Sequence, residues 1–443
     1  MSAAIEASST PWWREPTRAQ RVTFLAAWLG WVLDAFDFTI FLLVMPQIAR
    51  EFGVSYVATA GSITLTLLVR MAGGLAAGWA SDRFGRKLPL MLSIAWFAVC
   101  DGAVSLAPSF GWVLALRTLF GFGMGAEWTS GATLAMENWP ARSRGIASGV
   151  LQGSWAVGYL LAAVVTALVV PAWGWRPMFA IAALPALLAL PIRWLVPESP
   201  EWLRGTHARA SVHPLSALRM PGMGRRLFWA SAMLAAGFGG YYAMTGVYSP
   251  MLAREHQLDT RAIAALVAAF NVGMLAGGAA WGALASRRGL VPAIALPALL
   301  MAVSAPLYVG AAPALLGVGA FLGGLLGAGH SGTTPLLLAT LFPPEVRARA
   351  VGFVYHAAAF AAAFVPFGIA AFAQRSATSL AATIATVVAL CEVLVALAAV
   401  GGLRPLLTRP ADAQSPIARN SAGSAPQSGT TINRPDSGGT PVP

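Results

Sequence analysis

The sequence predicts an all-α integral membrane protein with twelve transmembrane helices, on the basis of its composition and its apolar runs. Hydrophobic residues fill 57% of the 443 positions, charged residues fill only 10%, and the mean hydropathy is +0.67. A soluble domain carries about 25% charged residues, which it needs to face water. This chain has too few charges for an aqueous surface, so lipid is the expected solvent for most of it.

Twelve runs are long enough to span a bilayer, because a spanning helix needs about 20 mostly apolar residues. They lie near 24–46, 57–79, 89–107, 111–136, 146–169, 175–196, 226–250, 261–285, 290–310, 313–341, 349–373 and 378–402. Polar segments divide the chain into a cytoplasmic N-terminus (1–22), an N-terminal six-helix half (23–196), a cytoplasmic linker (197–225), a C-terminal six-helix half (226–403) and a tail (404–443). The tail is rich in Ser, Pro, Gly and Thr, so we expect it to be disordered and cytoplasmic.

The basic residues predict the orientation. If the N-terminus lies inside, 22 of the 29 basic residues fall on the inner side, five fall outside, and two (Arg70 and Arg117) lie within spans. This positive-inside asymmetry places both termini in the cytoplasm, with the cell inner membrane as the expected location. The net charge of +12 comes from short Arg clusters between apolar runs, so nucleic acid is not an expected partner. Residues 1–22 contain no apolar region of a cleavable signal.

A repeat divides the chain into two similar halves. Four residues recur 203 positions later: Pro140, Arg144, Ala147 and Gly149 return as Pro343, Arg347, Ala350 and Gly352. Both groups open a predicted span, the fifth in one half and the eleventh in the other. Transport proteins built from such repeats bind their substrate between the halves, near the bilayer midplane. Two pseudo-symmetric six-helix halves are therefore expected.

A loop between the second and third spans resembles a known family signature. It reads GWASDRFGRK and contributes Gly78, Asp82, Arg83, Gly85, Arg86 and Lys87. This segment resembles the signature loop G-x-x-x-D-R-x-G-R-[RK] of the major facilitator superfamily. The resemblance implies that the loop latches one conformation of a transporter whose two halves rock against each other.

A second segment resembles one branch of that superfamily. GWVLDAFDF in the first span is similar to the sialate:proton symporter family, which includes sialic acid permeases and lactate/pyruvate permeases. RTLFGFGMGAEW and ENWPARSRGIASG are similar to the same family, and the similarity covers mainly the N-terminal half. Proton-coupled aromatic-acid permeases have a similar D-x-x-D segment. The resemblance therefore leaves more than one class of organic acid open as the substrate.

Charged residues inside the predicted spans are the candidates for function. Each costs about 2.5–3.5 kcal/mol at mid-helix, and Asp34, Arg70 and Glu127 lie roughly 15 Å from the inner ends of their spans. We interpret Asp34, Asp37 and Glu127 as proton-carrying candidates, because a carboxyl in a dry cavity is readily protonated. Arg70 or Arg117 is the candidate anion partner, because the guanidinium fork binds a carboxylate through two hydrogen bonds. The alternative is a permanent Asp34–Arg70 salt bridge.

Other polar groups in the spans are weaker candidates. His330 lies opposite Glu127 in the repeat, so it is either a further proton site or a side chain bonded to a neighbouring backbone. Gln152, Asn271 and Tyr241 are candidate substrate-binding residues, with helix bridging or packing as the alternative. Glu392 and His356 also lie in apolar runs.

The leading hypothesis is a proton-coupled symporter that imports an organic acid, such as sialic acid or lactate/pyruvate, by alternating access. The alternatives are an aromatic-acid or other metabolite permease or exporter and, in another class, a membrane nutrient sensor that transports nothing. The chain has no P-loop and no metal-ligand spacing, so an enzyme is not predicted, and no cofactor is expected beyond the proton gradient. The expected partners are a small organic anion, a proton and the lipid bilayer. The protein is expected to be a monomer.

Overall fold

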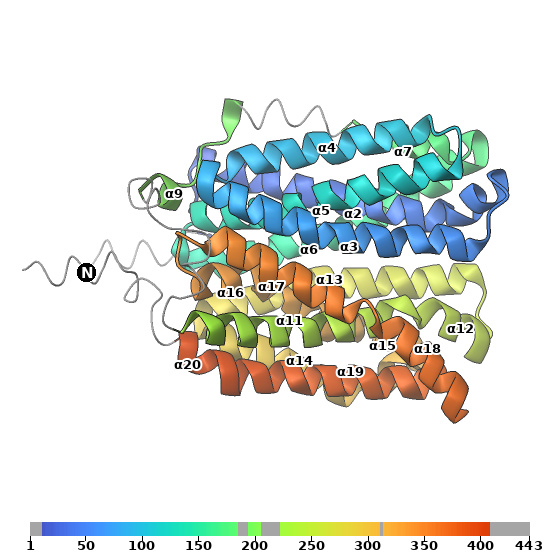
Figure 1. Ribbon diagram of the computed structural model, residues 1–443. Coiled ribbons are helices and arrows are strands. Elements are labelled where there is room, and N and C mark those ends of the chain that lie inside the picture. Colours follow the sequence, from blue (N-terminus) through green and yellow to red (C-terminus); the bar gives the residue numbers. More distant parts are fainter. Residues whose placement is uncertain (1–10, 185–193, 205–221, 311–312, 408–443) are drawn as a thin grey trace, which may run out of the picture.

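The computed structural model describes residues 11–184, 194–204, 222–310 and 313–407, and within these ranges it contains helices and no strand. The long helices run side by side along one direction in two bundles (Figure 1). Eight helical segments of the described part are long and apolar enough to cross a membrane. Large apolar side chains cover their outer surface, for example Val99 (68% exposed) and Val303 (82% exposed). Such a surface is stable only in lipid.

Six helices form the N-terminal bundle. They are α2 (Arg18–Glu51), α3 (Tyr56–Phe84), α4 (Lys87–Ser105), α5 (Phe110–Asn138), α6 (Arg144–Trp173) and α7 (Arg176–Ala182). Helix α2 begins before the apolar run because Thr17 and Gln20 form a capping box, in which each side chain bonds the other residue's backbone N–H. The predicted sixth span begins with α7, but its residues 185–193 lie outside the described part of the chain.

The C-terminal bundle contains more breaks than the sequence predicts. Its helices are α11 (Met223–Gly246), α12 (Tyr248–Glu255), α13 (Thr260–Arg288), α14 (Leu290–Tyr308), α15 (Leu316–Leu322), α16 (Thr334–Leu341), α17 (Arg347–Ala362), α18 (Val365–Ser376) and α19 (Leu380–Leu397). The predicted span at 313–341 is one helical run of mixed geometry, because a π-helix and a 3₁₀-helix occupy Gly323–Thr333 between α15 and α16. The span at 349–373 is broken before Pro366, which lacks a backbone N–H.

Two short helices lie outside the two bundles. Helix α9 (Pro200–Arg204) belongs to the linker between them, and α20 (Arg404–Leu407) ends the described chain. The predicted disordered tail lies almost wholly outside the described residues, as do residues 205–221 of the linker. The predicted domain boundaries therefore stay predictions.

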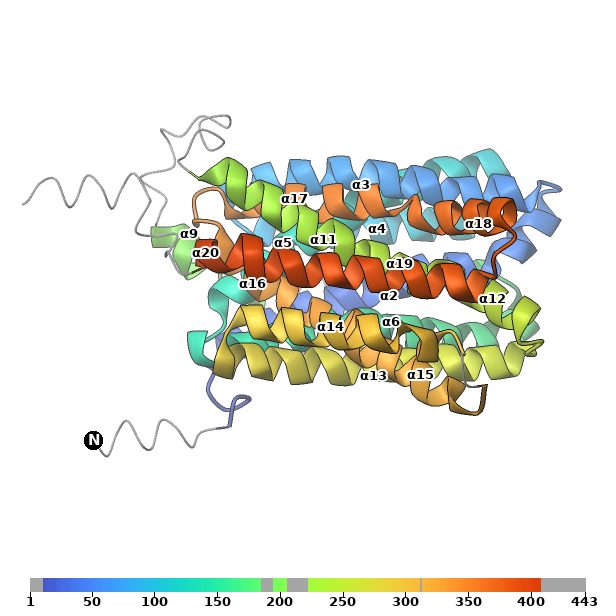
Figure 2. The same ribbon diagram turned by 90° about the horizontal axis from the view of Figure 1, so that it is seen from below.

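The repeat seen in the sequence has the same structural role in both bundles. Arg144 donates to the carbonyl of Trp139 at 3.0 Å, and Arg347 donates to the carbonyl of Phe342 at 3.0 Å. The repeated glycines also correspond. A Cβ at Gly149 would overlap the carbonyl of Gly278, and a Cβ at Gly352 would overlap that of Gly74. Glycine at these positions lets α6 approach α13 and α17 approach α3, so the bundles touch along two equivalent helix pairs. Figure 2 shows α13 lying along α6 and α17 along α3.

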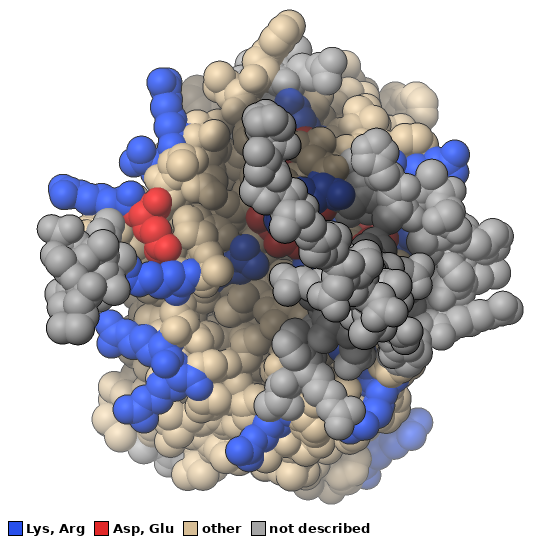
Figure 3. All heavy atoms as spheres, turned by 90° about the vertical axis from the view of Figure 1, so that its left-hand side faces the viewer, with Lys and Arg blue, Asp and Glu red and all other residues tan. Residues whose placement is uncertain are grey.

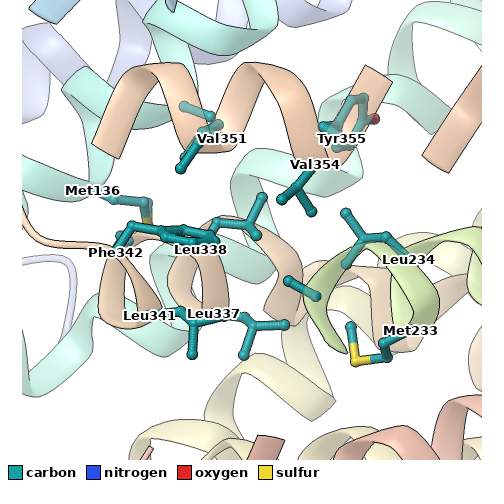
Figure 4. Packing of buried hydrophobic residues seen from close by; sticks show 14 of the residues in the cluster. Met136, Met233, Leu234, Leu337, Leu338, Leu341, Phe342, Val351, Val354 and Tyr355 are labelled. Carbon is teal, nitrogen blue, oxygen red and sulfur yellow. The ribbon is translucent and has the colours of Figure 1, made fainter. Parts of the chain in front are cut away.

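A hydrophobic cluster fills the space between the bundles at the end that carries the termini. Leu234 of α11, Leu338 of α16 and Val354 of α17 point toward one another, and Met136 of α5 reaches the same cluster (Figure 4). Residues from both halves therefore share one core at this end.

The end of the molecule that carries the termini is rich in basic side chains. Figure 3 shows Lys and Arg around the rim of this face, with few Asp or Glu. Exposed members of the rim are Arg83, Arg142, Arg287, Arg288 and Arg404. We call this the terminal end of the molecule and the opposite end the distal end.

Candidate substrate and proton site

Two adjoining cavities lie between the bundles. The central cavity has a volume of about 70 Å³, and the distal cavity, which extends toward the distal end, has about 250 Å³. Both are lined by the same four side chains: Arg70, Trp155, Tyr241 and Tyr242. The central cavity is also lined by Trp31, Gln152, Phe238, His330, Thr334 and Tyr355. The two cavities therefore adjoin along a shared wall near mid-membrane.

Arg70 is a buried cation on this shared wall. Its side chain extends from α3 and is only 5% exposed. Its Nε and Nη2 have no hydrogen-bond partner among the described residues, and its guanidinium carbon lies 5.8 Å from the ring centroid of Tyr355. A buried donor without a partner costs about 1–3 kcal/mol, and more when it is charged. An acceptor that enters the cavity would recover this free energy.

Aromatic rings from both halves surround Arg70. The Trp128 and Tyr355 rings are stacked at 3.5 Å with a 19° interplanar angle, and Trp31 lies 5.7 Å from Trp128 and 5.4 Å from Trp155. Trp155 donates from Nε1 to the Tyr241 hydroxyl at 3.1 Å, which joins α6 to α11 across the halves. The wall therefore offers flat apolar faces beside one buried positive charge.

Asp34 and Glu127 form one group of buried acids with Arg70. Both carboxyls are essentially unexposed, and both act electrostatically on each other and on Arg70. Neither Asp34 oxygen has a hydrogen-bond partner among the described residues, and Glu127 Oε2 also lacks one. Among the ion pairs of the described residues, none joins Asp34 to Arg70 within 4.0 Å. In this conformation the two carboxyls are close to Arg70 without being bound to it.

A second group contains Asp37, Asp101 and Arg117. Arg117 Nη1 lies 3.1 Å from Asp101 Oδ1, and its guanidinium carbon lies 4.7 Å and 4.0 Å from the ring centroids of Phe41 and Phe120. Asp37 faces Asp101, and both carboxyls are fully buried. Arg117 lines neither of the two cavities. The structure therefore places the two candidate arginines in different surroundings.

The remaining candidates lie on or near the cavity walls. Gln152 lines the central cavity, and its Oε1 has no hydrogen-bond partner among the described residues. Asn271 lines the distal cavity and donates from Nδ2 to the carbonyl of Val267 at 2.9 Å, whereas Tyr241 lines both cavities. His330 contacts Glu392 rather than a backbone carbonyl, with Nε2 3.1 Å from Oε2.

The signature loop joins the two halves at the terminal end. Asp82 accepts hydrogen bonds from the backbone N–H groups of Ala348 and Arg349 at 3.2 and 3.1 Å, and from Arg349 Nε at 3.0 Å. A Cβ at Gly78 would crowd the Ala348 carbonyl, so glycine permits this approach. Two other members of the loop lie at its edge. Arg83 stacks over Trp79 at 5.6 Å, and Lys87 donates its backbone N–H to Glu198 at 3.2 Å.

Glu137 holds a second contact across the halves. It pairs with Arg86 at 3.0 Å and with Arg347 at 2.9 Å, and Arg347 also pairs with Glu201 of α9. Burial opposes the charge on Arg86, yet the carboxylates of Glu137 and Asp82 outweigh this and raise the pKa of its guanidinium above the usual value. The tight turn at Gly85, where φ is +99°, directs Arg86 toward Glu137. These contacts close the terminal end between the halves.

This arrangement of two bundles, an intervening cavity and a loop that joins the halves at one end matches a known family. The family model described as Major Facilitator Superfamily matches residues 27–255, which is more than half of the chain. The chain belongs to the Major Facilitator Superfamily. It is a multi-pass membrane transporter of small organic metabolites and not an enzyme, and the predicted twelve-span fold in two halves is confirmed.

Three relatives within the Major Facilitator Superfamily are similar over most of their length. A probable 4-methylmuconolactone transporter of Cupriavidus pinatubonensis is 32% identical over 78% of this chain and 82% of its own. The sialic acid transporter NanX of Escherichia coli is 27% identical over 79% of this chain and 86% of its own. A cis,cis-muconate transport protein of Acinetobacter baylyi is 28% identical over 78% and 86%, respectively.

A solved structure in the Major Facilitator Superfamily has the same fold. The proton:xylose symporter XylE bound to a deoxyglucose derivative has a TM-score of 0.70 and 21% identity, covering 86% of this chain and 94% of its own. At this identity the likeness establishes the fold alone.

Several aromatic residues at the site were missed by sequence reasoning. Trp31 and Tyr355 line the central cavity, and Trp128 packs against both. Glu392 was noted only as lying in an apolar run, and the structure makes it the partner of His330. Trp31 lies three residues before Asp34 in the GWVLDAFDF segment, so helical spacing placed it on a similar face. Tyr355 comes from the other half, and no local pattern connects it to Trp128.

Proposed function

We propose that this transporter imports an organic carboxylate together with protons, and that a flat unsaturated or aromatic acid is its substrate. One observation supports the substrate class: Arg70 is a buried cation with unpaired donors, and it lies on a cavity wall made of aromatic rings. A carboxylate would accept hydrogen bonds from the guanidinium, and a flat body would stack on the rings.

The cavity lining favours a flat acid over sialic acid and over lactate or pyruvate. Sialic acid carries many hydroxyls, each of which needs a polar partner when buried. Trp31, Trp155, Phe238 and Tyr355 offer ring faces, beside fewer polar side chains such as Gln152 and Thr334. Lactate and pyruvate carry only a methyl group besides their polar atoms, so they would cover little of these rings. Relatives whose names specify muconate and 4-methylmuconolactone support a flat acid, whereas the similarity to NanX keeps sialic acid among the substrates to be tested.

The balance of buried charge supports proton coupling. Four acids (Asp34, Asp37, Asp101 and Glu127) share the interior of the N-terminal half with two arginines. Ionised carboxylates without a compensating cation are costly in a dry interior, so two of the four are expected to hold protons. When a substrate carboxylate binds Arg70, Asp34 and Glu127 lose part of the cation that favoured their ionised forms. Anion binding would then promote proton uptake at the same site.

The orientation follows from the charge pattern and the closed end. The basic rim marks the terminal end as cytoplasmic, so we propose that both termini lie in the cytoplasm and that the protein resides in the inner membrane as a monomer. The signature loop holds that end closed in this conformation. Substrate would enter through the distal cavity, reach Arg70, and leave after the contacts of Asp82 and Glu137 break.

The test is uptake into proteoliposomes that contain the purified chain. An inward proton gradient is imposed, and the panel contains 4-hydroxybenzoate, nicotinate, cis,cis-muconate, N-acetylneuraminate, lactate, pyruvate and glucose. Gradient-dependent accumulation of a flat acid supports the proposal. Accumulation of N-acetylneuraminate alone would reject the substrate class, and uptake that ignores the gradient would reject symport. Removal of residues 408–443 tests the sensor alternative, because uptake without the tail removes its only candidate signalling segment.

A further inference from the structure

His330 and Glu392 form a buried ionisable pair in the C-terminal half, separate from the acids around Arg70. His330 Nε2 lies 3.1 Å from Glu392 Oε2, and the two side chains are 7% and 0% exposed. The histidine comes from the 3₁₀-helix at Gly329–Thr333 and the glutamate comes from α19. Glu392 Oε1 has no hydrogen-bond partner among the described residues.

Local structure positions the pair at the cavity. Because the span between α15 and α16 departs from α-helical geometry, His330 lies on the wall of the central cavity. Two glycines of α11 leave space for the pair: a Cβ at Gly240 would lie 3.0 Å from Glu392 Oε1, and a Cβ at Gly237 would lie 3.6 Å from His330 Cε1. The imidazole therefore has one edge against Glu392 and another on the cavity.

The groups around the pair include one buried cation, Arg70. Titratable or charged groups on the neighbouring helices and cavity walls are Tyr241 and Tyr242 of α11, Tyr308 of α14, Tyr355 and His356 of α17, Cys391 of α19, and Arg70 across the cavity. Within the described residues, Glu392 forms an ion pair with His330. The pair is neutral when it shares one proton, and this is the favoured state in a dry interior.

We propose that His330 and Glu392 are a second proton site, which takes up one proton when the substrate binds; this proposal rests on the proposed function. In the resting state the pair holds one proton and is neutral, and the edge of the His330 ring that faces away from Glu392 lies on the central cavity. A substrate oxygen accepts a hydrogen bond from that edge and so holds the proton on the imidazole. Glu392 then binds a second proton, so the pair changes from net charge zero to plus one. Release of the substrate at the terminal end reverses both steps.

A second proton site sets the net charge that each transport cycle moves across the membrane. One proton at the acids near Arg70 and one at Glu392 would accompany each monoanion, so each cycle moves one net positive charge inward.

The experiment measures the reversal potential of 4-hydroxybenzoate flux in proteoliposomes with defined proton and potassium gradients. Wild type is expected to move two protons per 4-hydroxybenzoate and to respond to membrane potential. Glu392→Gln is expected to move one proton and to lose that response while it still responds to the proton gradient.

Cys391→Ala is the matched control, because it changes the neighbouring residue of α19 outside the cavity lining, and it is expected to behave as wild type. Potential dependence that survives in Glu392→Gln would overturn the second site. Electroneutral, gradient-driven uptake by wild type would overturn it as well and leave symport standing. Wild-type uptake that ignores the proton gradient would instead reject the proposed function.

A measurement without substrate keeps the proposal testable if Glu392→Gln does not fold or 4-hydroxybenzoate is not transported. The chain is labelled with ¹⁵N-histidine, and the His330 signal is assigned by its loss in His330→Gln. In wild type we expect the His330 ring signals to change with the pH of the sample, because the pair binds and releases a proton. His330 ring signals that stay unchanged at every pH at which the protein is folded would overturn the proposal.

Discussion

Arg117 Nη1 lies 3.1 Å from Asp101 Oδ1 inside the N-terminal half, and this ion pair distinguishes the two buried arginines. Arg117 has an acidic partner and two aromatic rings, and it lines neither cavity. Arg70 lies on the wall shared by both cavities, and two of its nitrogens lack partners. We therefore assign anion binding to Arg70 and a structural role to Arg117.

Replacing Arg70 by lysine should weaken substrate binding. A lysine keeps the positive charge but loses the guanidinium fork, and hydrogen bonds to charged groups contribute about 1.5–3 kcal/mol. We expect the apparent KM for 4-hydroxybenzoate to rise about tenfold or more. Arg117→Lys serves as the contrast and should change KM far less, while lowering the thermal unfolding temperature. Equal effects of the two substitutions on KM would contradict the assignment.

Removing the acids near Arg70 should weaken the coupling of transport to the proton gradient. Asp34→Asn and Glu127→Gln each keep the size of the side chain and delete one proton site. We expect gradient-driven accumulation to fall below that of wild type, whereas exchange of labelled for unlabelled 4-hydroxybenzoate across the membrane continues. Counterflow and gradient-driven uptake are measured on the same vesicles. Wild-type accumulation in both variants would show that these carboxyls carry no coupled proton.

Glu137 should matter for stability because its removal leaves Arg86 and Arg347 buried without their main acidic partner. Breaking a buried ion pair costs about 3–5 kcal/mol. Glu137→Gln should therefore lower the thermal unfolding temperature markedly. The control is Glu51→Gln, because Glu51 pairs with Arg176 at 2.6 Å but is 42% exposed, and exposed pairs contribute about 0–1 kcal/mol. A similar loss in both variants would argue against a special role for burial at Glu137.

Closure of the terminal end should depend on the glycine contact between α6 and α13. A Cβ at Gly149 would overlap the carbonyl of Gly278, whereas a Cβ at Gly61 meets nothing within 4 Å. Gly149→Ala should therefore reduce uptake strongly by hindering this conformation, and Gly61→Ala should not. Accessibility of a cysteine placed at Ser286, beside Gly145 at the terminal end, reports the opening directly. Unchanged uptake and accessibility in Gly149→Ala would refute the role of this contact.

Much of the fold could be predicted because bilayer thickness imposes its own pattern on the sequence. The apolar runs predicted the spans, and the recurrence of Arg144 as Arg347 predicted two similar halves. In the structure both arginines donate a hydrogen bond to the preceding loop. The departure from α-helical geometry at Gly323–Thr333 was not predicted, because glycine is also frequent in regular transmembrane helices. Helix α2 begins before the apolar run at 24–46, since the capping box at Thr17 extends the helix.

The candidate site was only partly predictable for a related reason. Helix depth placed Asp34, Arg70 and Glu127 near one level of the membrane, and the structure brings them into one electrostatic group. Depth does not specify which helix faces meet. The stacking of Trp128 on Tyr355 and the pairing of His330 with Glu392 both depend on contacts between distant segments. Such contacts leave no local spacing in the sequence.

The measurement that tests the central claim most directly follows protons during substrate entry. Proteoliposomes with no imposed gradient contain a pH-sensitive dye, and 4-hydroxybenzoate is added outside. Symport predicts that the lumen acidifies as the acid enters, and that this signal is smaller per molecule of acid in Asp34→Asn and Glu127→Gln. Entry of labelled 4-hydroxybenzoate without lumenal acidification, beyond that of protein-free vesicles, would contradict proton-coupled import.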